Sequence, residues 1–323
     1  MEDLIQKLPE VYQDIIVGGQ LVAKGKRDCK TRCDSILPLV KPHDVILDMG
    51  SAEGYFTKKI AMAYPDSLVV SFECNPPVAE VQRESLERDG VYNVVLCQHR
   101  LTLDDLRRWA RAVECIDVVL ALSILHHFPP EDVMEVCDIL CSVASTVVTE
   151  VPGPHEHEAC GGGAKTVAYD HTIGFTPLCD VESHLGDYIR SVRFSRGGVA
   201  RIGLDAYMNV PHEGGRKFRV RQDGVGWLIG SDDWCRCAIQ GVNLWNLLHF
   251  NIIWPPKKWF RHHVTAAYMG LVDKSDVRLW NCLVTSSGIR AIDYMYPYDY
   301  DDQAAYHVGD INRLEEEINA RIT

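Results

Sequence analysis

Two glycines and two acidic residues in the first quarter of the chain have the types and spacing of a ligand site. Residues 45–57 read VILDMGSAEGYFT, where Asp48 ends an apolar run and Gly50 and Gly54 follow it. Glycine permits a tight turn and a close approach of the backbone to a ligand. Glu73 lies 19 residues after Gly54, close to the spacing of about 20 at which such folds present a carboxylate to ribose hydroxyls. These residues predict a site for a ligand that contains a ribose.

Four other residues are candidates for catalysis. His126 and His127 end the run DVVLALSILHHF, and a histidine can serve as a general base near neutral pH. Consecutive residues point in different directions, so we expect at most one of the two to face a site; alternatively, both are hydrogen-bonded loop residues. Glu150 and His155 belong to the loop EVPGPHEHEACGGG. Its H-x-H and single Cys match no recognised metal-ligand spacing, so we expect a substrate-binding loop and no metal.

The elements that must position these residues alternate between strands and helices. β-branched, continuously apolar runs predict strands, and apolar residues at helical spacing predict helices between them. This alternation predicts an α/β fold with a parallel sheet covered on both faces. Two further runs, 188–194 and 201–210, are expected to close the sheet as an antiparallel hairpin. The strands are expected at 45–50, 68–74, 93–97, 117–123 and 145–151, and the helices at 55–64, 78–89, 103–112 and 130–144.

The run DMGSAEGYF, the acidic strand end at Glu73 and the run DVVLALSILHHF together resemble class I S-adenosylmethionine-dependent methyltransferases. The resemblance covers residues 40–210 and implies a Rossmann-like seven-stranded sheet with helices on both faces. It also implies that the cofactor is S-adenosyl-L-methionine, with its methionine end held by Asp48 and by carbonyls near Gly50. A nicotinamide or flavin site is the alternative, but it usually shows G-x-G-x-x-G, whereas this loop reads G-x-x-x-G.

The predicted cofactor site comprises eleven residues at strand ends and in the glycine loop. Gln98 and His99 are expected to meet the adenine edge, and Tyr55 or Phe56 to contact the sulfonium cation, although core packing is the preferred role for Phe56. The complete set is Asp48, Gly50, Ser51, Gly54, Tyr55, Phe56, Glu73, Cys74, Gln98, His99 and Ser123.

The expected reaction is O-methylation of a small molecule or saccharide, in which His126, His127, Glu150 and His155 are the catalytic candidates. The strand end ALSILHHF lacks the Asp of Lys-Asp-Lys-Glu ribose methyltransferases and the Asn/Asp-Pro-Pro-Tyr pattern of amide methyltransferases. A net charge of −12 disfavours nucleic acid as a partner. A module that binds S-adenosylmethionine without turnover remains the alternative.

The chain is expected to divide into an N-terminal helical cover (1–39), the cofactor-binding domain (40–210) and a helical or mixed C-terminal appendage (211–323). The cover contains predicted helices at 2–16 and 29–39. The appendage is expected to recognise the acceptor or to form a homodimer, and its Trp245, Trp254, Trp259 and Trp280 would supply a core or a sugar-stacking surface.

Two stretches of the appendage have alternative interpretations. Asp276, Asn281 and Asp293 resemble the catalytic loop and metal-binding Asp of kinase-like folds, but LVTSSGIRAID within this stretch is also typical of a simple hairpin. The basic run RKFRVR (216–221) predicts the solvated face of an edge strand. No apolar run reaches the length of about 20 residues that spans a bilayer, and we expect a cytoplasmic protein.

Overall fold

The computed structural model describes residues 1–110, 116–152, 156, 164–183 and 188–196, and shorter segments in the rest of the chain. Those later segments are 219–222, 227–230, 234–238, 242–260, 262–263, 282–286, 288–291, 293–295, 316 and 320. The chain divides into two compact units, Met1–Ala200 and Arg201–Thr323, and each is described by itself.

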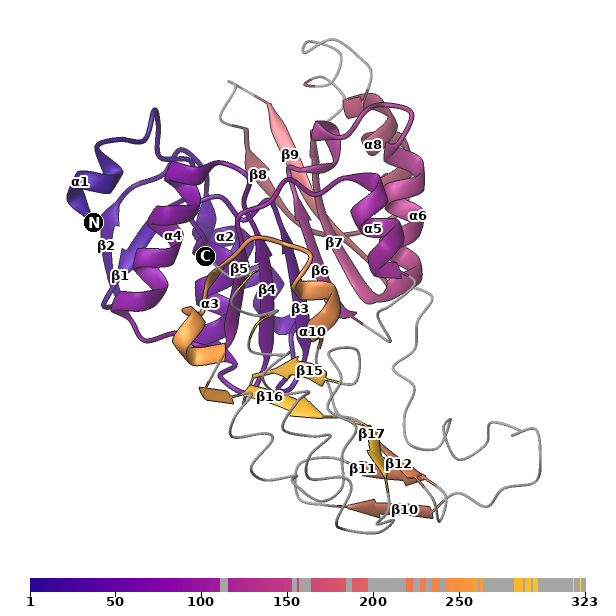
Figure 1. Cartoon of the computed structure of the whole chain (residues 1–323). Helices are drawn as coiled ribbons and strands as arrows, with labels where there is room; N and C mark the ends of the chain where they lie inside the picture. The colour runs from indigo at the N-terminus through magenta and orange to yellow at the C-terminus, as the bar shows by residue number, and fades with distance from the viewer. Residues whose placement is uncertain are drawn as a thin grey trace. The chain divides into compact units, whose positions relative to one another are not determined.

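Seven strands of unit 1 share one sheet in the order β5-β4-β3-β6-β7-β9-β8 (Figure 1). Strands β3 to β7 pair in parallel, whereas β9 runs antiparallel to both β7 and β8. The first four strands are buried along their whole length, as continuously apolar runs require. The bounds are β3 (Val45–Met49), β4 (Leu68–Phe72), β5 (Val94–Cys97), β6 (Ile116–Leu122), β7 (Ala144–Pro152), β8 (Thr176–Glu182) and β9 (Ile189–Arg196).

Helices cover both faces of this sheet (Figure 1). On one face, α2 (Cys29–Ile36) packs against α3 (Tyr55–Ala63), and α4 (Pro76–Arg88) lies beside them. On the other, α6 (Val133–Val143) packs against both α5 (Leu103–Ala110) and α8 (Ala164–Thr172). The predicted α/β class and Rossmann-like sheet are therefore confirmed.

The prediction of a helix over residues 2–16 is wrong. Only α1 (Glu2–Ile5) is helical, and β1 (Ile15–Val17) pairs with β2 (Gln20–Ala23) in an antiparallel hairpin. Pro9 interrupts helical hydrogen bonding. Gly18 and Gly19 both have positive φ, 58° and 75°, which suits a two-residue hairpin turn of type I′. The apolar residues at helical spacing belong instead to an extended segment. The second helix of the cover exists, as α2 followed by the 3-10 turn η1 (Leu37–Leu39).

The hairpin that closes the sheet also differs from the expected one. Strand β9 matches the predicted run at 188–194, but its antiparallel partner in the hairpin is β8, which precedes it in the chain. The run 201–210 lies outside the described residues. Neither β8 nor the preceding helix α8 was expected, because their sequences are too polar to show a clear period.

Unit 2 is mixed in its described segments. One sheet has the order β10-β11-β12-β17 and another the order β13-β15-β16. The predicted hairpin at LVTSSGIRAID is confirmed as β15 paired with β16. Residues 219–221 of the basic run lie in β10, at an edge of its sheet, as predicted. The bounds are β10 (Arg219–Gln222), β11 (Trp227–Gly230), β12 (Trp234–Ala238), β13 (Val242–Asn243), α10 (Leu244–Leu247), β14 (Ile252–Trp254), β15 (Cys282–Thr285), β16 (Gly288–Ala291) and β17 (Asp293–Met295).

Within the described segments, Trp254 is buried, with 1% of its surface exposed, as a core residue would be, whereas Trp280 lies outside them. No helix in the described parts of the two units combines the length and the apolar character needed to cross a bilayer.

Candidate functional site

A cleft of about 740 Å³ opens in unit 1 where the carboxyl ends of β3, β4, β5 and β6 meet. This volume suits a small-molecule ligand, and its position is where open parallel sheets bind ligands. Its lining residues are Tyr12, Gly50, Ala52, Phe72, Glu73, Cys74, His99, Arg100, Leu101, Leu122, Ser123, Ile124, His126, His127, Phe128 and Arg190.

The loop after β3 needs its glycines. Gly50 and Gly54 have φ of 68° and 81°, values that side chains rarely allow. A Cβ added at Gly50 would lie 2.7 Å from Cδ1 of Ile124. Ser51 does not line the cleft: it is fully buried, and its Oγ donates to Gln82 Oε1 at 2.8 Å. Gly50 thus keeps the backbone of the loop open to the cleft, while Ser51 anchors the loop from below.

Glu73 directly follows β4 and lines the cleft with a fixed carboxylate. Its Oε2 accepts the backbone N–H of Ala52 at 2.9 Å and its Oε1 accepts that of Asn75 at 2.7 Å. Burial raises the pKa of Glu73, although these N–H groups oppose the shift. Each carboxylate oxygen has a second lone pair, so the geometry leaves Glu73 able to accept hydroxyl hydrogen bonds from a ligand in the cleft.

Asp48 lies below the loop and is not among the residues lining the cleft. Its side chain is buried and accepts a hydrogen bond from Thr57 Oγ1 at 2.5 Å. Burial raises the pKa of Asp48 to about 6, with the nearby Glu73 charge adding to the effect. This contact joins the end of β3 to the first turns of α3.

The aromatic residues at the cleft are not those predicted. Tyr55 and Phe56 are both buried and do not line it. The Arg32 guanidinium lies over the ring of Phe56, with its carbon 4.9 Å from the ring centroid. This contact agrees with the core role preferred for Phe56. Tyr12 and Phe72 line the cleft instead. Tyr12 belongs to the N-terminal segment, whose fold the sequence periodicity did not predict, so no local signal pointed to it.

His99 lines the cleft after β5, whereas Gln98 is half-buried outside it. His99 Nε2 lies 2.9 Å from Oδ2 of Asp105, which also accepts from the Thr102 hydroxyl. Burial tends to raise the pKa of Asp105, but His99 and Thr102 outweigh it and the pKa is lowered. The ring of His99 is thereby held at the cleft wall. Cys74 is exposed and also lines the cleft.

His126 and His127 both line the cleft, so the expectation that at most one would do so is wrong. They belong to the 3-10 turn η2 (Leu125–His127), and their ring centroids lie 4.4 Å apart. His126 is half-buried and His127 is exposed.

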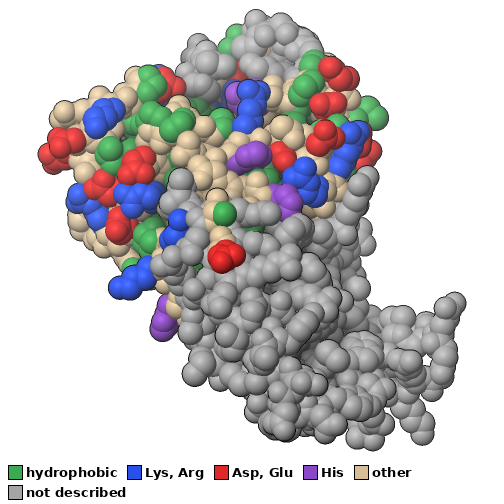
Figure 2. All heavy atoms as spheres, in the orientation of Figure 1, with side chains coloured by type: hydrophobic (Ala, Val, Ile, Leu, Met, Phe, Trp, Pro, Cys, Tyr) green, Lys and Arg blue, Asp and Glu red, His purple; other side chains and the backbone are tan. Residues whose placement is uncertain are grey.

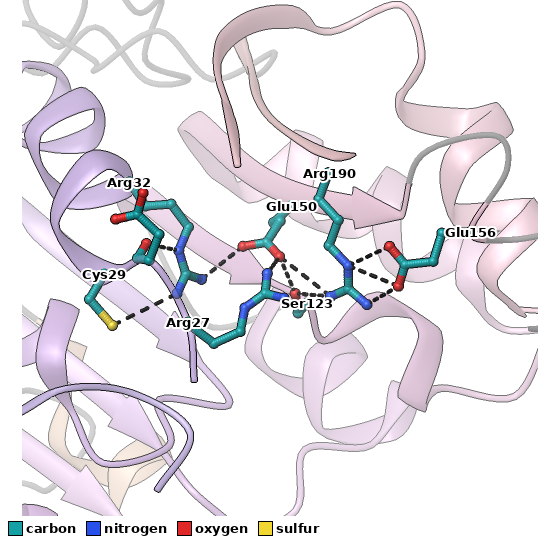
Figure 3. Close-up of polar contacts among 8 residues, drawn as sticks. Arg27, Cys29, Arg32, Ser123, Glu150, Glu156 and Arg190 are labelled. Carbon is teal, nitrogen blue, oxygen red and sulfur yellow. Dashed lines mark hydrogen bonds and ion pairs between the residues drawn. The ribbon is translucent and has the colours of Figure 1, made fainter. Parts of the chain in front are cut away.

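Glu150 is held in a buried ion-pair network and does not line the cleft (Figure 3). Its carboxylate accepts from Arg27, from Arg32 Nη1 at 2.8 Å and from Ser123 Oγ at 2.6 Å. Burial alone would raise the pKa of Glu150, but the guanidiniums lower it to about 2. A carboxylate so strongly stabilised in its charged form is a poor proton acceptor, and the structure therefore argues against the catalytic role expected for Glu150.

Arg190, on β9, extends this network to the cleft surface. Its Nε donates to both carboxylate oxygens of Glu156 at 3.0 and 2.8 Å, and its Nη1 donates to Ser123 Oγ at 2.9 Å. Ser123 itself lines the cleft with a positive φ of 55°. Arg190 was not predicted, because the residues that surround it are distant in sequence. His155 lies outside the described residues.

The N-terminal segment is attached to the glycine loop through Glu53. The buried carboxylate of Glu53 accepts the backbone N–H of Tyr12 at 2.7 Å and that of Gln13 at 2.8 Å. In return, Gln13 Oε1 accepts the N–H of Tyr55 at the first turn of α3 at 2.9 Å. These contacts place Tyr12 at the cleft and make the segment part of the site.

No three His, Cys, Asp or Glu side chains gather as a metal site within the described parts of the chain. Residues 157–160 of the His/Glu/Cys loop fall outside those parts.

Comparison with known proteins identifies a methyltransferase domain in unit 1. Residues 46–145 match the family model of a methyltransferase domain. No curated protein matches the chain. Among solved structures, the bifunctional kinase-methyltransferase WbdD is similar at 16% identity and a TM-score of 0.51, covering 97% of this chain and 86% of WbdD. The N-terminal domain of EvdMO1, solved with SAH bound, is 14% identical with a TM-score of 0.44, covering 61% of this chain and 94% of that domain. At such identities the likeness to WbdD establishes the fold.

Proposed function

We propose that this chain, whose residues 46–145 form a class I methyltransferase domain, binds S-adenosylmethionine in the cleft of unit 1 and methylates an oxygen of a small molecule or saccharide. The observation that carries the proposal is Glu73. Its carboxylate is fixed by two backbone N–H groups and lines the cleft beside the positive-φ glycine loop. A carboxylate in this place suits a ribose diol.

The residues present fit this cofactor at each of its parts. Glu73 would accept the ribose hydroxyls, His99 would border the adenine, and the backbone near Gly50 would approach the methionine end. Tyr12 and Phe72 offer aromatic faces to a cation. When bound, S-adenosylmethionine supplies an electrophilic methyl group on a positively charged sulfur.

The acceptor would enter at the end of the cleft lined by η2. There, His126 or His127 would take the proton of an acceptor hydroxyl as the new oxygen–carbon bond forms and the carbon–sulfur bond breaks. Alignment of the nucleophile with the methyl group accounts for much of the expected rate enhancement. The wall formed by Leu122, Ile124 and Phe128 would exclude water from this end.

Titration calorimetry with S-adenosylhomocysteine tests the cofactor assignment. We expect Glu73→Ala to weaken binding by about tenfold or more, because the buried carboxylate makes hydrogen bonds that correspond to about 1.4 kcal/mol or more. Glu87→Ala, at a residue exposed on α4, is the matched control and should bind as the wild type does. Equal affinity of Glu73→Ala and wild type would mean that the cofactor assignment is wrong.

Methyl-labelled S-adenosylmethionine, incubated with fractions of a host extract, separates an enzyme from a binding module. An enzyme transfers label to at least one fraction, whereas a module that only binds the cofactor labels none. His126→Ala and His127→Ala should each be assayed with the labelled fraction. Unchanged turnover in one variant removes that histidine as the base, and unchanged turnover in both removes the proposed base altogether.

A second activity, phosphoryl transfer by unit 2, is supported by the likeness to a bifunctional kinase-methyltransferase, which covers 97% of this chain. In kinase-like folds the catalytic Asp and Asn precede the metal-binding Asp. Here the hairpin spans residues 282–291, between Asn281 and Asp293, which is compatible with that order. Asp276 and Asn281 lie outside the described residues, and Asp293 begins β17.

Transfer of the labelled γ-phosphate of ATP to extract fractions tests this second activity. We expect transfer by the wild-type chain and its loss in Asp293→Asn, with binding of S-adenosylhomocysteine retained. Absence of transfer by the wild type, or unchanged transfer by Asp293→Asn, would leave unit 2 with the role of acceptor recognition or dimerisation.

A further inference from the structure

The end of the cleft beyond β6 and β9 is basic, although the whole chain carries a net charge of −12. Arg190, His126 and His127 line this end, and Arg100 lines the cleft near β5. Among the described lining residues, Glu73 is the only carboxylate, and it belongs to the proposed ribose contact. Figure 2 shows histidine side chains close to lysine and arginine side chains on the face of unit 1 turned to the viewer. The described ionisable residues that line the acceptor end are therefore an arginine and two histidines, with no carboxylate among them.

A buried network of ion pairs lies behind this end. Three guanidiniums, of Arg27, Arg32 and Arg190, are joined to two carboxylates, of Glu150 and Glu156 (Figure 3). All five side chains are 2% exposed or less. A buried charge is costly unless it is paired, so these ion pairs hold the guanidinium of Arg190 in a fixed orientation.

Arg190 is the member of the network that can reach such an anion. Its Nε and one Nη2 hydrogen point to Glu156, and its Nη1 hydrogens point to Ser123 and Glu150. The guanidinium has five N–H donors, so one Nη2 hydrogen has no acceptor among the described residues. Because Arg190 lines the cleft, this hydrogen is the one that an anion bound at the acceptor end would use.

We propose that the methyl acceptor carries an anionic oxygen group, a carboxylate or a phosphate, which binds at the cleft end formed by Arg190, His126 and His127. The inference rests on the proposed function and specifies the acceptor as an acid. The anion accepts a charge-assisted hydrogen bond from Arg190 and further hydrogen bonds from the two imidazoles. It thereby holds the acceptor next to the methyl donor. A carboxylate and a phosphate share this chemistry, and binding measurements distinguish them.

The experiment uses the full chain saturated with S-adenosylhomocysteine and titrates it with sodium phosphate or sodium acetate, against sodium chloride at equal ionic strength. We expect saturable calorimetric binding of at least one anion. Stronger binding of phosphate identifies a phosphorylated acceptor, and stronger binding of acetate identifies a carboxylic acid. Arg190→Gln should weaken the binding of the preferred anion by about tenfold or more, which corresponds to about 1.4 kcal/mol.

Arg193→Gln is the matched control, since Arg193 lies on the same strand, donates to the Ile173 carbonyl and does not line the cleft. It should bind the anion as the wild type does. Arg190→Lys should give an intermediate affinity, because it keeps the charge but loses the planar fork. Should Arg190→Gln fail to fold, two other variants provide the test: Arg190→Lys and His127→Gln, the latter at an exposed position. Each should weaken the binding of the anion about threefold or more.

The inference is overturned if neither anion binds to the loaded protein, or if the substitutions at Arg190 and His127 leave the affinity unchanged. In those cases S-adenosylhomocysteine still binds and the proposed function stands. Failure of S-adenosylhomocysteine itself to bind overturns both proposals together, so the two failures are distinguishable.

Discussion

Two strand-end carboxylates of unit 1 are buried in opposite electrostatic surroundings. Glu150 lies near the end of β7 and is surrounded by guanidiniums, which lower its pKa to about 2. Asp48 accepts a hydrogen bond from the Thr57 hydroxyl, which lies 3.2 Å from Ser71 Oγ, and burial raises the pKa of Asp48 to about 6. Both residues are buried to a similar extent, so their neighbours decide in which direction each pKa shifts.

The first prediction concerns Glu150. Its pKa is about 2 in the folded chain and ordinarily 4.5, so its contribution to stability, about 3 kcal/mol, is complete above pH 4.5 and is lost as the pH falls toward 2. Glu150→Gln should lower the free energy of unfolding in urea at pH 7 by about 3 kcal/mol or more, because it leaves buried guanidiniums without their partner. Glu135→Gln, at a surface ion pair, is the control and should change it by less than about 1 kcal/mol. Similar losses for the two variants would contradict the network as a stabilising unit.

The second prediction has the opposite sign. The pKa of Asp48 is raised from 3.8 to about 6, so the folded state is favoured while Asp48 is protonated, and this contribution is lost as the pH rises from about 4 through 6. Asp48→Asn cannot ionise at this position and therefore keeps its stability over this pH range. Relative to the wild type, its free energy of unfolding should therefore increase by about 2 kcal/mol between pH 4.5 and 7.5. The control is Asp66→Asn at an exposed position, and a curve for Asp48→Asn parallel to the wild type would contradict the assignment.

At the scale of elements, the site depends on the turn that joins β3 to α3. Gly54 caps α3 with a left-handed φ of 81° and packs against the side chain of Gln82 on α4. The turn is also attached to the N-terminal segment, through Glu53. The glycine loop is thus held by elements on both sides of it, which favours one defined shape for the cleft.

Gly54→Ala and Gly90→Ala separate the effect of backbone conformation from that of space. Both residues have positive φ, 81° and 64°, but a Cβ at Gly90 meets only Tyr92 at 4.0 Å, whereas one at Gly54 would clash with Gln82. Gly90→Ala should cost about 1 kcal/mol from φ alone. Gly54→Ala should lower the free energy of unfolding by about 2–4 kcal/mol, since overpacking adds to the strain. It should also weaken the binding of S-adenosylhomocysteine. Urea unfolding and calorimetry measure both effects; equal losses in the two variants would show that packing against Gln82 is unimportant.

At the scale of the whole molecule, the cleft collects residues from Tyr12 to Arg190, nearly the full length of unit 1. A site assembled from such distant segments exists only in the folded state. A ligand that binds there must therefore stabilise the fold by mass action.

S-adenosylhomocysteine at one hundred times its dissociation constant should raise the free energy of unfolding by about 2.7 kcal/mol. Scanning calorimetry of the full chain with increasing ligand measures this as a rising Tm. Under the same ligand concentrations Glu73→Ala should show a smaller rise, and adenine alone serves as a control for weak binding. A Tm that does not depend on the concentration of S-adenosylhomocysteine would contradict a site in the folded cleft.

The features that the sequence determined by itself are local ones. Strand and helix periods predicted β3 to β7 and the helices between them, since burial on a sheet or helix face follows a short repeat. The glycine loop and Glu73 were also readable, because a positive φ and a strand-end position are set within a few residues. The roles of the predicted site residues stay predictions for the binding and labelling experiments.

What only the tertiary structure decided is which side chains meet. Arg27 and Glu150 are 123 residues apart and Arg190 and Ser123 are 67 apart, and no local pattern relates such pairs. The N-terminal segment shows apolar residues at helical spacing, yet Pro9 and the hairpin at Gly18 give it an extended path that brings Tyr12 to the cleft. The charge and the lining of the acceptor end depend on this packing of distant segments, because a guanidinium acquires its role only from the carboxylates and the cavity that folding places around it.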